Sequence, residues 1–255
     1  MSRGFGSIAA FSNTAADYAA TMAPALAPVA AEVIRLASLR PGETVLDVGT
    51  GTGTAARLAR GEGRRVIALD AAAGMLDIAR REVPEAELLE ADFTHIPLDD
   101  GSVDVLIAVH ALLFAADRVA TLLEWRRLTV PGGRMALSVP GPGRVVPSAV
   151  FGEVYDRYGI EWHPNDYPDT SELSTWASDA GWEEIITDAD GAASISLGDE
   201  DAFRTWLQVG RLASDWSPER IDAFAVELMA VCPRGPDGSF RIPFGAQYLT
   251  ARRRA

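Results

Sequence analysis

The chain has 255 residues and a formal net charge of −13, because 36 acidic residues outnumber 23 basic ones, all of them arginines. Hydrophobic residues make up 48% and charged residues 23%, a globular composition that excludes a disordered or disulfide-stapled chain. The lack of lysine excludes lysine Schiff-base chemistry, and the acidic balance disfavours nucleic acid as a partner.

Cysteine, histidine and the apolar stretches limit the cellular setting and the kinds of site. Cys232 is the only cysteine, so no internal disulfide can form, and no histidine–cysteine cluster has metal-ligand spacing. The uncharged stretches 18–31 and 105–116 are shorter than the roughly 20 residues of a membrane span. The first dozen residues lack the apolar region of a signal peptide. We therefore expect a cytoplasmic protein with no membrane contact and no metal.

Residues 1–40 are predicted to be helical. A polar residue at 12–14 would cap a first helix that runs through Met22, and a second helix would begin after Pro24. The Pro-Gly pair at 41–42 would end this second helix. We expect the two helices to form a lid.

From Thr44 onward, short apolar segments alternate with helical ones. The predicted strands span 45–48, 66–69, 87–91, 103–109 and 134–139. The predicted helices span 55–60, 74–82 and 118–128. The Pro-Gly-Gly run at 131–133 is predicted to be a turn. Repeated strand–helix units imply an α/β fold with a mostly parallel sheet.

After Pro140 the alternation becomes irregular. The pattern predicts an irregular stretch to about residue 167. The further predicted elements are helices at 171–180, 201–213 and 218–231 and strands at 182–187 and 244–251. No clear boundary interrupts the chain, so we expect one domain over 1–255. Its expected parts are a helical lid (1–40), a cofactor-binding core (41–140) and substrate-facing insertions with the last two strands (141–255).

The segment Val-Leu-Asp-Val-Gly-Thr-Gly-Thr-Gly at 45–53 carries the strongest chemical signal. It is a strand that runs into a glycine turn and then a helix, whose free N–H groups can bind a carboxylate or phosphate. Asp70 ends the next strand, where an acid can accept hydrogen bonds from both ribose hydroxyls. Thr54 replaces the last glycine of the dinucleotide fingerprint, which favours an adenosyl over a nicotinamide cofactor.

Four segments in this order and spacing carry a resemblance to a known family: 45–53, 66–76, 91–104 and 128–137. The chain resembles the class I S-adenosylmethionine-dependent methyltransferases, most of all the small-molecule branch with the ubiquinone and menaquinone C-methyltransferases. The resemblance implies a Rossmann-like, seven-stranded, mostly parallel sheet with an antiparallel last strand. It also implies helices on both faces, an N-terminal helical lid, a helical insertion and S-adenosyl-L-methionine as cofactor.

The resemblance also assigns cofactor-binding residues. At the methionine end it places Asp47, Gly49, Gly51 and Ala108. At the ribose it places Asp70, and at the adenine Met75, the Asp92 carboxylate and the Phe93 N–H. Thr50 and Ala71 are also expected to contact the cofactor, and Tyr18 would close over it.

The acceptor side is predicted less directly. His110 follows a strand end and is the first candidate for a general base, although methyl transfer needs no fixed catalytic triad. Many relatives carry a histidine or a Gln-His pair where this chain has Leu113 and Phe114. The candidate acceptor-binding residues are Phe11, Met22, Phe114, Trp162, His163, Tyr167 and Trp206. Trp176 and Trp182 are expected to be packing residues instead.

We therefore expect methyl transfer from S-adenosylmethionine to a small organic acceptor, aromatic or lipophilic, with no nucleic acid or membrane as partner. Two alternatives stay open at this point. One is a protein of the same fold that keeps the cofactor without methyl transfer, such as a cyclase or a binding module. The other is a nicotinamide-dependent oxidoreductase, which the lack of lysine disfavours. The sequence does not fix the oligomeric state.

Overall fold

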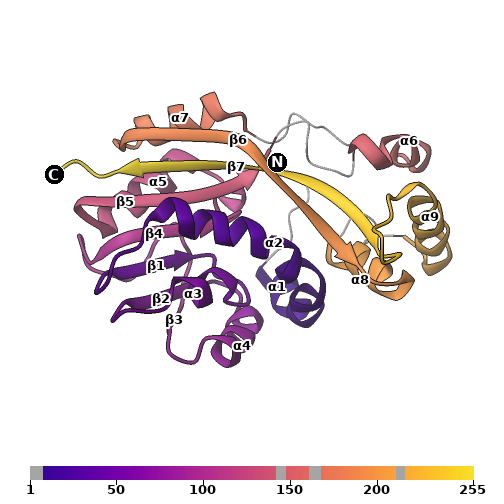
Figure 1. Ribbon diagram of the computed structural model, residues 1–255, viewed down its shortest axis with the longest axis horizontal. Helices are drawn as coiled ribbons and strands as arrows, with labels where there is room; N and C mark the ends of the chain where they lie inside the picture. The colour runs from indigo at the N-terminus through magenta and orange to yellow at the C-terminus, as the bar shows by residue number, and fades with distance from the viewer. Residues whose placement is uncertain (1–7, 142–147, 161–167, 211–215) are drawn as a thin grey trace.

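A seven-stranded sheet organises the molecule (Figure 1). The computed structural model describes residues 8–141, 148–160, 168–210 and 216–255. The strand order is β3-β2-β1-β4-β5-β7-β6, and only the β5–β7 and β7–β6 pairs are antiparallel. The strands are β1 Thr44–Val48, β2 Arg65–Asp70, β3 Glu87–Glu90, β4 Val103–Val109, β5 Thr129–Pro140, β6 Glu183–Leu197 and β7 Phe240–Arg252. The predicted mostly parallel sheet with an antiparallel last strand is confirmed.

Helices cover both faces of this sheet, as expected. The helices are α1 Ile8–Asn13, α2 Ala15–Ala37, α3 Thr54–Ala59, α4 Ala73–Glu82, α5 Arg118–Leu128, α6 Ser148–Tyr158, α7 Thr170–Asp179, α8 Glu200–Gly210 and α9 Pro218–Val231, with a 3₁₀ turn η1 at Leu112–Phe114. Alternate residues of β1 point to opposite faces. Val45 belongs to the apolar core on the face that α2 and α3 cover, whereas Leu46 belongs to the core on the other face, which includes residues of α5 and α7.

The prediction of two N-terminal helices that break at Pro24 is wrong. Residues 15–37 form the single helix α2, which contains both Pro24 and Pro28. Each proline removes a backbone N–H and so leaves the carbonyl four residues earlier without its helical partner. Both prolines, like Ala20, lie on the exposed side of α2, where water can bind these carbonyls. The opposite side packs on the sheet and holds the helix together.

Helix α2 also has the length and composition of a membrane span. It is the one helix within the described ranges that meets this test, with a mean hydropathy of 1.3. In the fold, its residues Val29 and Val33 are almost completely buried against the sheet. The apolar residues on this side of α2 therefore pack against the sheet.

The region after Pro140 differs most from the sequence-based expectation. Strands β6 and β7 are much longer than predicted and pair beyond the end of β5, from Ala192↔Gly245 to Leu197↔Phe240. They form a two-stranded arm, with α8 and α9 at its far end and α6 beside them (Figure 1). Helix α6 lies where an irregular stretch was expected. Its buried residues Phe151, Val154 and Tyr155 have helical spacing, a signal that the sequence interpretation missed.

The Pro-Gly-Gly run at 131–133 lies inside β5 and is not a separate turn. The β4–β5 register shifts there, because Val103 pairs with Thr129 but Val105 pairs with Arg134. The extra residues bulge out of the strand, with Gly132 at a φ of +76°. The predicted turn is therefore wrong, because the strand continues through these residues, although Gly132 has the positive φ that favours glycine.

A second apolar core fills the far end of the arm, and we call it the aromatic cluster. Its largest buried members are Phe151, Tyr155, Phe203, Trp206, Phe224 and Phe240. Ala25 of α2 belongs to the same cluster, and Met22 packs against it. Helix α2 therefore contacts both the sheet and the aromatic cluster.

Candidate functional site

Three glycines shape the loop between β1 and α3, and each has a different reason to lack a side chain. Gly49, Gly51 and Gly53 have φ values of +68°, +56° and +90°, which favour glycine. A Cβ on Gly49 would lie 2.6 Å from Ala111 Cβ, and one on Gly53 would lie 2.8 Å from Val83 Cγ2. A Cβ on Gly51 would meet only the Tyr18 ring, at 3.8 Å. Gly49 and Gly53 therefore permit close packing, and Gly51 lies beneath the tyrosine.

Asp70 links this loop to the end of β2. Its Oδ2 accepts the Gly51 N–H at 2.8 Å, and its Oδ1 accepts the Ala72 N–H at 2.9 Å. Burial raises the pKa of Asp70, and the backbone N–H groups of Ala72, Gly51 and Ala71 oppose that shift. Each carboxylate oxygen can accept more than one hydrogen bond. The side chain therefore orders the loop and can still accept from a ligand.

Asp47 is a buried acid directly below the same loop. It is only 1% exposed, and its Oδ2 accepts a 2.6 Å hydrogen bond from the Thr50 hydroxyl. Its other oxygen, Oδ1, has no hydrogen-bond partner within the described part of the chain. Burial raises the pKa of Asp47 to about 7, and this shift is opposed by the Thr50 hydroxyl and by the nearby Ala56 N–H, whose geometry falls short of a hydrogen bond to Oδ1. A buried acceptor without a partner is costly, so Oδ1 suits a donor supplied by a ligand.

The N-terminal helices cover this loop. The Tyr18 ring lies over Gly51, since a Cβ there would be 3.8 Å from the ring. Burial, and then the charge of Asp70, raise the pKa of Tyr18. Phe11 of α1 packs edge-on against Tyr18, with ring centres 6.4 Å apart, and against Phe114, at 5.4 Å. We call Phe11, Tyr18 and Phe114 the aromatic trio.

Helix α1 approaches α4 very closely at one point. The Gly74 N–H donates to Ser12 Oγ at 3.3 Å. A Cβ on Gly74 would lie 2.3 Å from the Ser12 carbonyl oxygen, closer than real Cβ atoms come. Helix α1, the first part of the predicted lid, therefore packs directly on α4. This close contact requires a residue without a side chain at position 74.

The predicted adenine residues lie on neighbouring elements. Met75 is buried with Ala15 and Ala72. Asp92 is exposed, and its Oδ1 accepts both the N–H and the hydroxyl of Thr94, at 2.8 and 2.7 Å. Phe93 follows in the same loop, where its carbonyl accepts the indole N–H of a buried tryptophan.

Two further predicted residues lie at the carboxyl end of β4, where Ala108 pairs with Val48 directly before the glycine loop. Ala108 is completely buried among core residues of the sheet, so it presents no accessible side chain. His110 ends the strand with a φ of +57°, and its N–H donates to the Ser138 carbonyl at 3.0 Å. Burial lowers the pKa of His110 to about 4, so its imidazole is neutral at pH 7 and a weak base.

The predicted acceptor residues do not all converge. Phe11 and Phe114 meet above the loop, whereas Met22 packs against the aromatic cluster. Trp206 was expected in a pocket wall, but it is only 6% exposed and packs against Phe151 and Phe203. A large apolar ring is removed from water both when it packs in a core and when it lines a pocket, so the sequence pattern of the helix does not separate the two. Trp162, His163 and Tyr167 lie outside the described residues.

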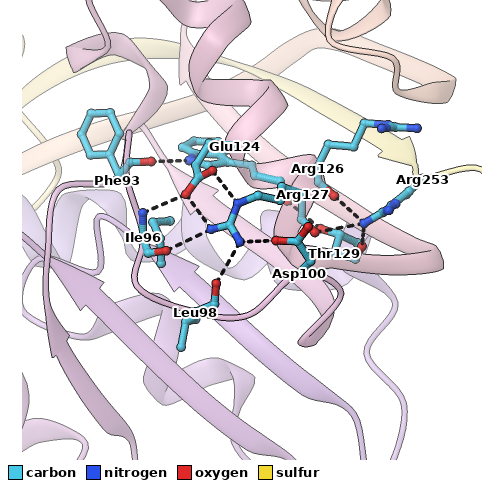
Figure 2. Close-up of polar contacts among 10 residues, drawn as sticks. Phe93, Ile96, Leu98, Asp100, Glu124, Arg126, Arg127, Thr129 and Arg253 are labelled. Carbon is cyan, nitrogen blue, oxygen red and sulfur yellow. Dashed lines mark hydrogen bonds and ion pairs between the residues drawn. The ribbon is translucent and has the colours of Figure 1, made fainter.

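Helix α5 supplies residues that the sequence interpretation missed (Figure 2). Trp125 donates to the Phe93 carbonyl at 2.9 Å, and Arg127 binds the stretch from Ile96 to Asp100 together with Glu124. The Glu124–Arg127 pair has i,i+3 helical spacing, which was the available signal. The expected packing of Trp182 agrees with its 3.0 Å hydrogen bond to the Leu122 carbonyl. Within the described ranges, no group of three metal-ligating side chains occurs.

A glycine turn at the carboxyl end of β1, with an acid at the end of β2, defines an α/β protein that binds a nucleoside cofactor. The Methyltransferase domain family matches residues 46–137. A malonyl-[acyl-carrier protein] O-methyltransferase of Serratia marcescens is 33% identical over 179 residues, 70% of this chain and 68% of the relative. The chain therefore belongs to the S-adenosylmethionine-dependent methyltransferases, and its cofactor is S-adenosylmethionine.

Further comparisons agree with this family. A demethylmenaquinone methyltransferase of Beutenbergia cavernae is 30% identical over 57% of this chain and 68% of the relative. A malonyl-[acyl-carrier protein] O-methyltransferase of Yersinia pestis is 36% identical, but only 52% of its length is matched. The solved Haemonchus contortus phosphoethanolamine N-methyltransferase 2 with S-adenosylmethionine has a TM-score of 0.55 at 17% identity, over 87% of this chain and 51% of that one. The resemblance to small-molecule methyltransferases is confirmed, and the nicotinamide alternative is not supported.

Proposed function

We propose that the protein methylates a small, planar or lipophilic organic acceptor that binds between the N-terminal lid and the segment after residue 140. The observation that carries this proposal is the aromatic trio above the glycine loop. Phe114 is 40% exposed and packs edge-on against Phe11, so the aromatic trio offers apolar surface beside the loop. Such a lining favours a flat apolar ligand over a phosphate-rich polymer, which the charge of −13 also disfavours.

For the cofactor, we propose the following fit. The partnerless Oδ1 of Asp47 would accept from the amino group of the methionine end, next to Thr50 and the loop glycines. Asp70, with Ala71 beside it, would bind the ribose hydroxyls, and Tyr18 would cover them. Met75, Asp92 and the Phe93 N–H would surround the adenine. Asp47 supports this fit most directly, because a buried carboxylate oxygen without a partner needs a donor.

Bound S-adenosylmethionine supplies an electrophilic methyl group, so the chain has to align the acceptor and exclude water. The aromatic trio and α1 would exclude water by covering the loop. His110 would stand near the acceptor as a neutral imidazole and not as a strong base, because its pKa is about 4. We therefore propose an acceptor atom that loses its proton without strong base catalysis.

The affinity for S-adenosylhomocysteine is expected to rise about tenfold from pH 6 to pH 8. The Asp47 carboxyl has a pKa of about 7 in the free protein, and a bound ammonium group would favour its ionised form. Binding below pH 7 therefore releases a proton and becomes weaker. Calorimetry across this range measures the effect. Asp47→Asn should retain only the titration of the ligand itself, and an equal pH dependence in this variant would contradict the assignment.

Replacing His110 by asparagine is expected to lower kcat by less than about tenfold. Asparagine tolerates the φ of +57° at this position, so the backbone is kept. A general base usually contributes about 100-fold or more to the rate. Steady-state kinetics from pH 5 to 9 make the comparison. A loss of 100-fold together with a changed pH profile would instead identify His110 as the base.

The proposed function is tested by methyl transfer to a panel of acceptors. The protein is incubated with S-adenosylmethionine that carries a labelled methyl group and with hydroquinones, phenols, free carboxylic acids and carrier-protein thioesters. Label on the planar, apolar compounds is expected. Label only on the carrier-bound acids would overturn the acceptor class, and cofactor binding without any label would favour a protein that has lost methyl transfer. The cytoplasmic location and the single domain stay predictions.

A further inference from the structure

Helix α5 binds the loop between β3 and β4. This loop contains Asp92 and Phe93, the proposed adenine residues. Three residues of α5 bind it through hydrogen bonds: Glu124, Trp125 and Arg127 (Figure 2). The loop has little regular structure of its own, so these contacts fix its position relative to the sheet.

Arg127 holds the second half of the loop with its whole guanidinium group. The group has five N–H donors, and the structure gives an acceptor for each. They are the two Glu124 carboxylate oxygens, the Ile96 and Leu98 carbonyls and Asp100 Oδ1, at 2.5 to 3.0 Å. Glu124 in turn accepts the Ile96 N–H at 2.8 Å. These hydrogen bonds therefore fix the backbone of residues 96–100 relative to α5.

Trp125 holds the first half at a single peptide group. Its ring is completely buried, and its indole N–H donates to the Phe93 carbonyl at 2.9 Å. The same peptide group carries the Thr94 N–H, which donates to Asp92 Oδ1 at 2.8 Å. A peptide group is rigid and planar, so fixing its carbonyl also fixes the direction of its N–H. The orientation of the exposed Asp92 carboxylate therefore depends on the indole of Trp125.

We propose that Trp125 is a positioning residue for adenine recognition. Through the Phe93–Thr94 peptide it orients the Asp92 carboxylate to accept from the exocyclic amino group of the adenine ring. The inference rests on the proposed adenine site at Asp92. Without the indole N–H, the part-buried Phe93 carbonyl turns toward another donor, because a carbonyl shielded from water is costly to leave without a partner. The Thr94 N–H then moves away from Asp92.

The test compares two ligands that differ only at the amino group. S-adenosylhomocysteine and its purine analogue, which carries a hydrogen in place of the amino group and keeps the ring nitrogens as acceptors, are titrated calorimetrically into the full-length protein. A site that accepts a hydrogen bond from the amino group should bind the analogue at least about tenfold more weakly. Asp92→Asn should remove most of this preference. A wild-type protein without preference would overturn the adenine site itself.

Trp125→Phe is the decisive variant, and Trp182→Phe is its matched control. Trp182 is also buried, and it donates its indole N–H at 3.0 Å to the Leu122 carbonyl of α5 and not to a group of the loop. Both variants should lose similar thermal stability. Trp125→Phe should reduce the adenine preference to about threefold or less, and Trp182→Phe should keep it.

A second variant avoids the buried core. Thr94→Val removes the hydroxyl that donates to Asp92 Oδ1 at 2.7 Å from an exposed position, and should lower the preference partially. An unchanged adenine preference in folded Trp125→Phe, with loss of preference in Asp92→Asn, would overturn the role of Trp125 and leave the adenine site intact. Equal losses of preference in Trp125→Phe and Trp182→Phe would reduce Trp125 to a general stabilising residue and also overturn the proposal.

Discussion

Replacing Asp70 by alanine is expected to weaken S-adenosylhomocysteine binding by at least about 100-fold. The carboxylate would lose two hydrogen bonds to ribose hydroxyls, each worth about 1.5–3 kcal/mol for a charged acceptor. It would also release the Gly51 N–H, so the glycine loop would lose one of its anchors. Calorimetry gives the dissociation constant, and thermal unfolding gives the stability of the same sample.

Asp104→Ala is the matched control for this variant. Asp104 is a half-buried carboxylate that also accepts a backbone N–H, that of Thr44 at 2.8 Å, but it lies at the opposite end of the parallel strands. It should cost about 1–2 kcal/mol of stability and leave the affinity unchanged. If Asp70→Ala bound the ligand as tightly as the wild type, Asp70 would have no role in the site.

Replacing Gly74 by alanine is expected to lower kcat by about 100-fold while the core stays folded. Alanine favours a helix over glycine by about 1 kcal/mol, so α4 itself should gain stability. The new Cβ would overlap the Ser12 carbonyl, 2.3 Å away, and would force α1 off α4. An open lid would admit water to the transfer site, which lowers turnover. Steady-state kinetics and circular dichroism together measure the effect.

Gly152→Ala provides the comparison. Gly152 lies in α6, and a Cβ there would meet no atom within 4 Å, so the same substitution changes a helix without a clash. Its kcat should equal that of the wild type. A Gly74→Ala protein with unchanged kcat would show that the closed lid is not needed for turnover. Removing residues 1–14 should act like Gly74→Ala. A longer truncation to residue 22 would cut into α2, which the sheet needs.

The elements from Thr44 to Val109 follow the sequence-based expectation because each strand there is short, and the central strands β1, β2 and β4 are apolar and bounded by glycine or charged residues. The expectation for α2 was wrong because it rested on the local rule that proline ends a helix. Packing of α2 on the sheet stabilises the helix despite its two prolines. The lengths of β6 and β7 were also underestimated. Their outer halves lie beyond the end of β5. The alternation of buried Ile195 and Leu197 with exposed Ser194 and Ser196 was a strand signal that the sequence interpretation missed.

Some residues of the candidate site could likewise be predicted from the sequence, and others could not. Gly49, Gly51 and Asp70 could be predicted because a loop that binds a nucleoside demands those residue types at that spacing. Trp125 could not be predicted, because its partner Phe93 lies 32 residues away in the sequence. Trp206 packs in the aromatic cluster, and the sequence could not distinguish this from a pocket wall, since an aromatic ring has the same sequence signature in both.

The position of β7 in the sheet has a consequence for biosynthesis. β7 is made after the other six strands, yet it lies between β5 and β6. While a ribosome is still translating residues 240–252, the β5 edge has no neighbour, and an open edge can pair with other chains. The nascent protein therefore depends on late closure of its sheet. A chaperone that shields this edge should raise the yield of folded protein more than one that acts on the first hundred residues.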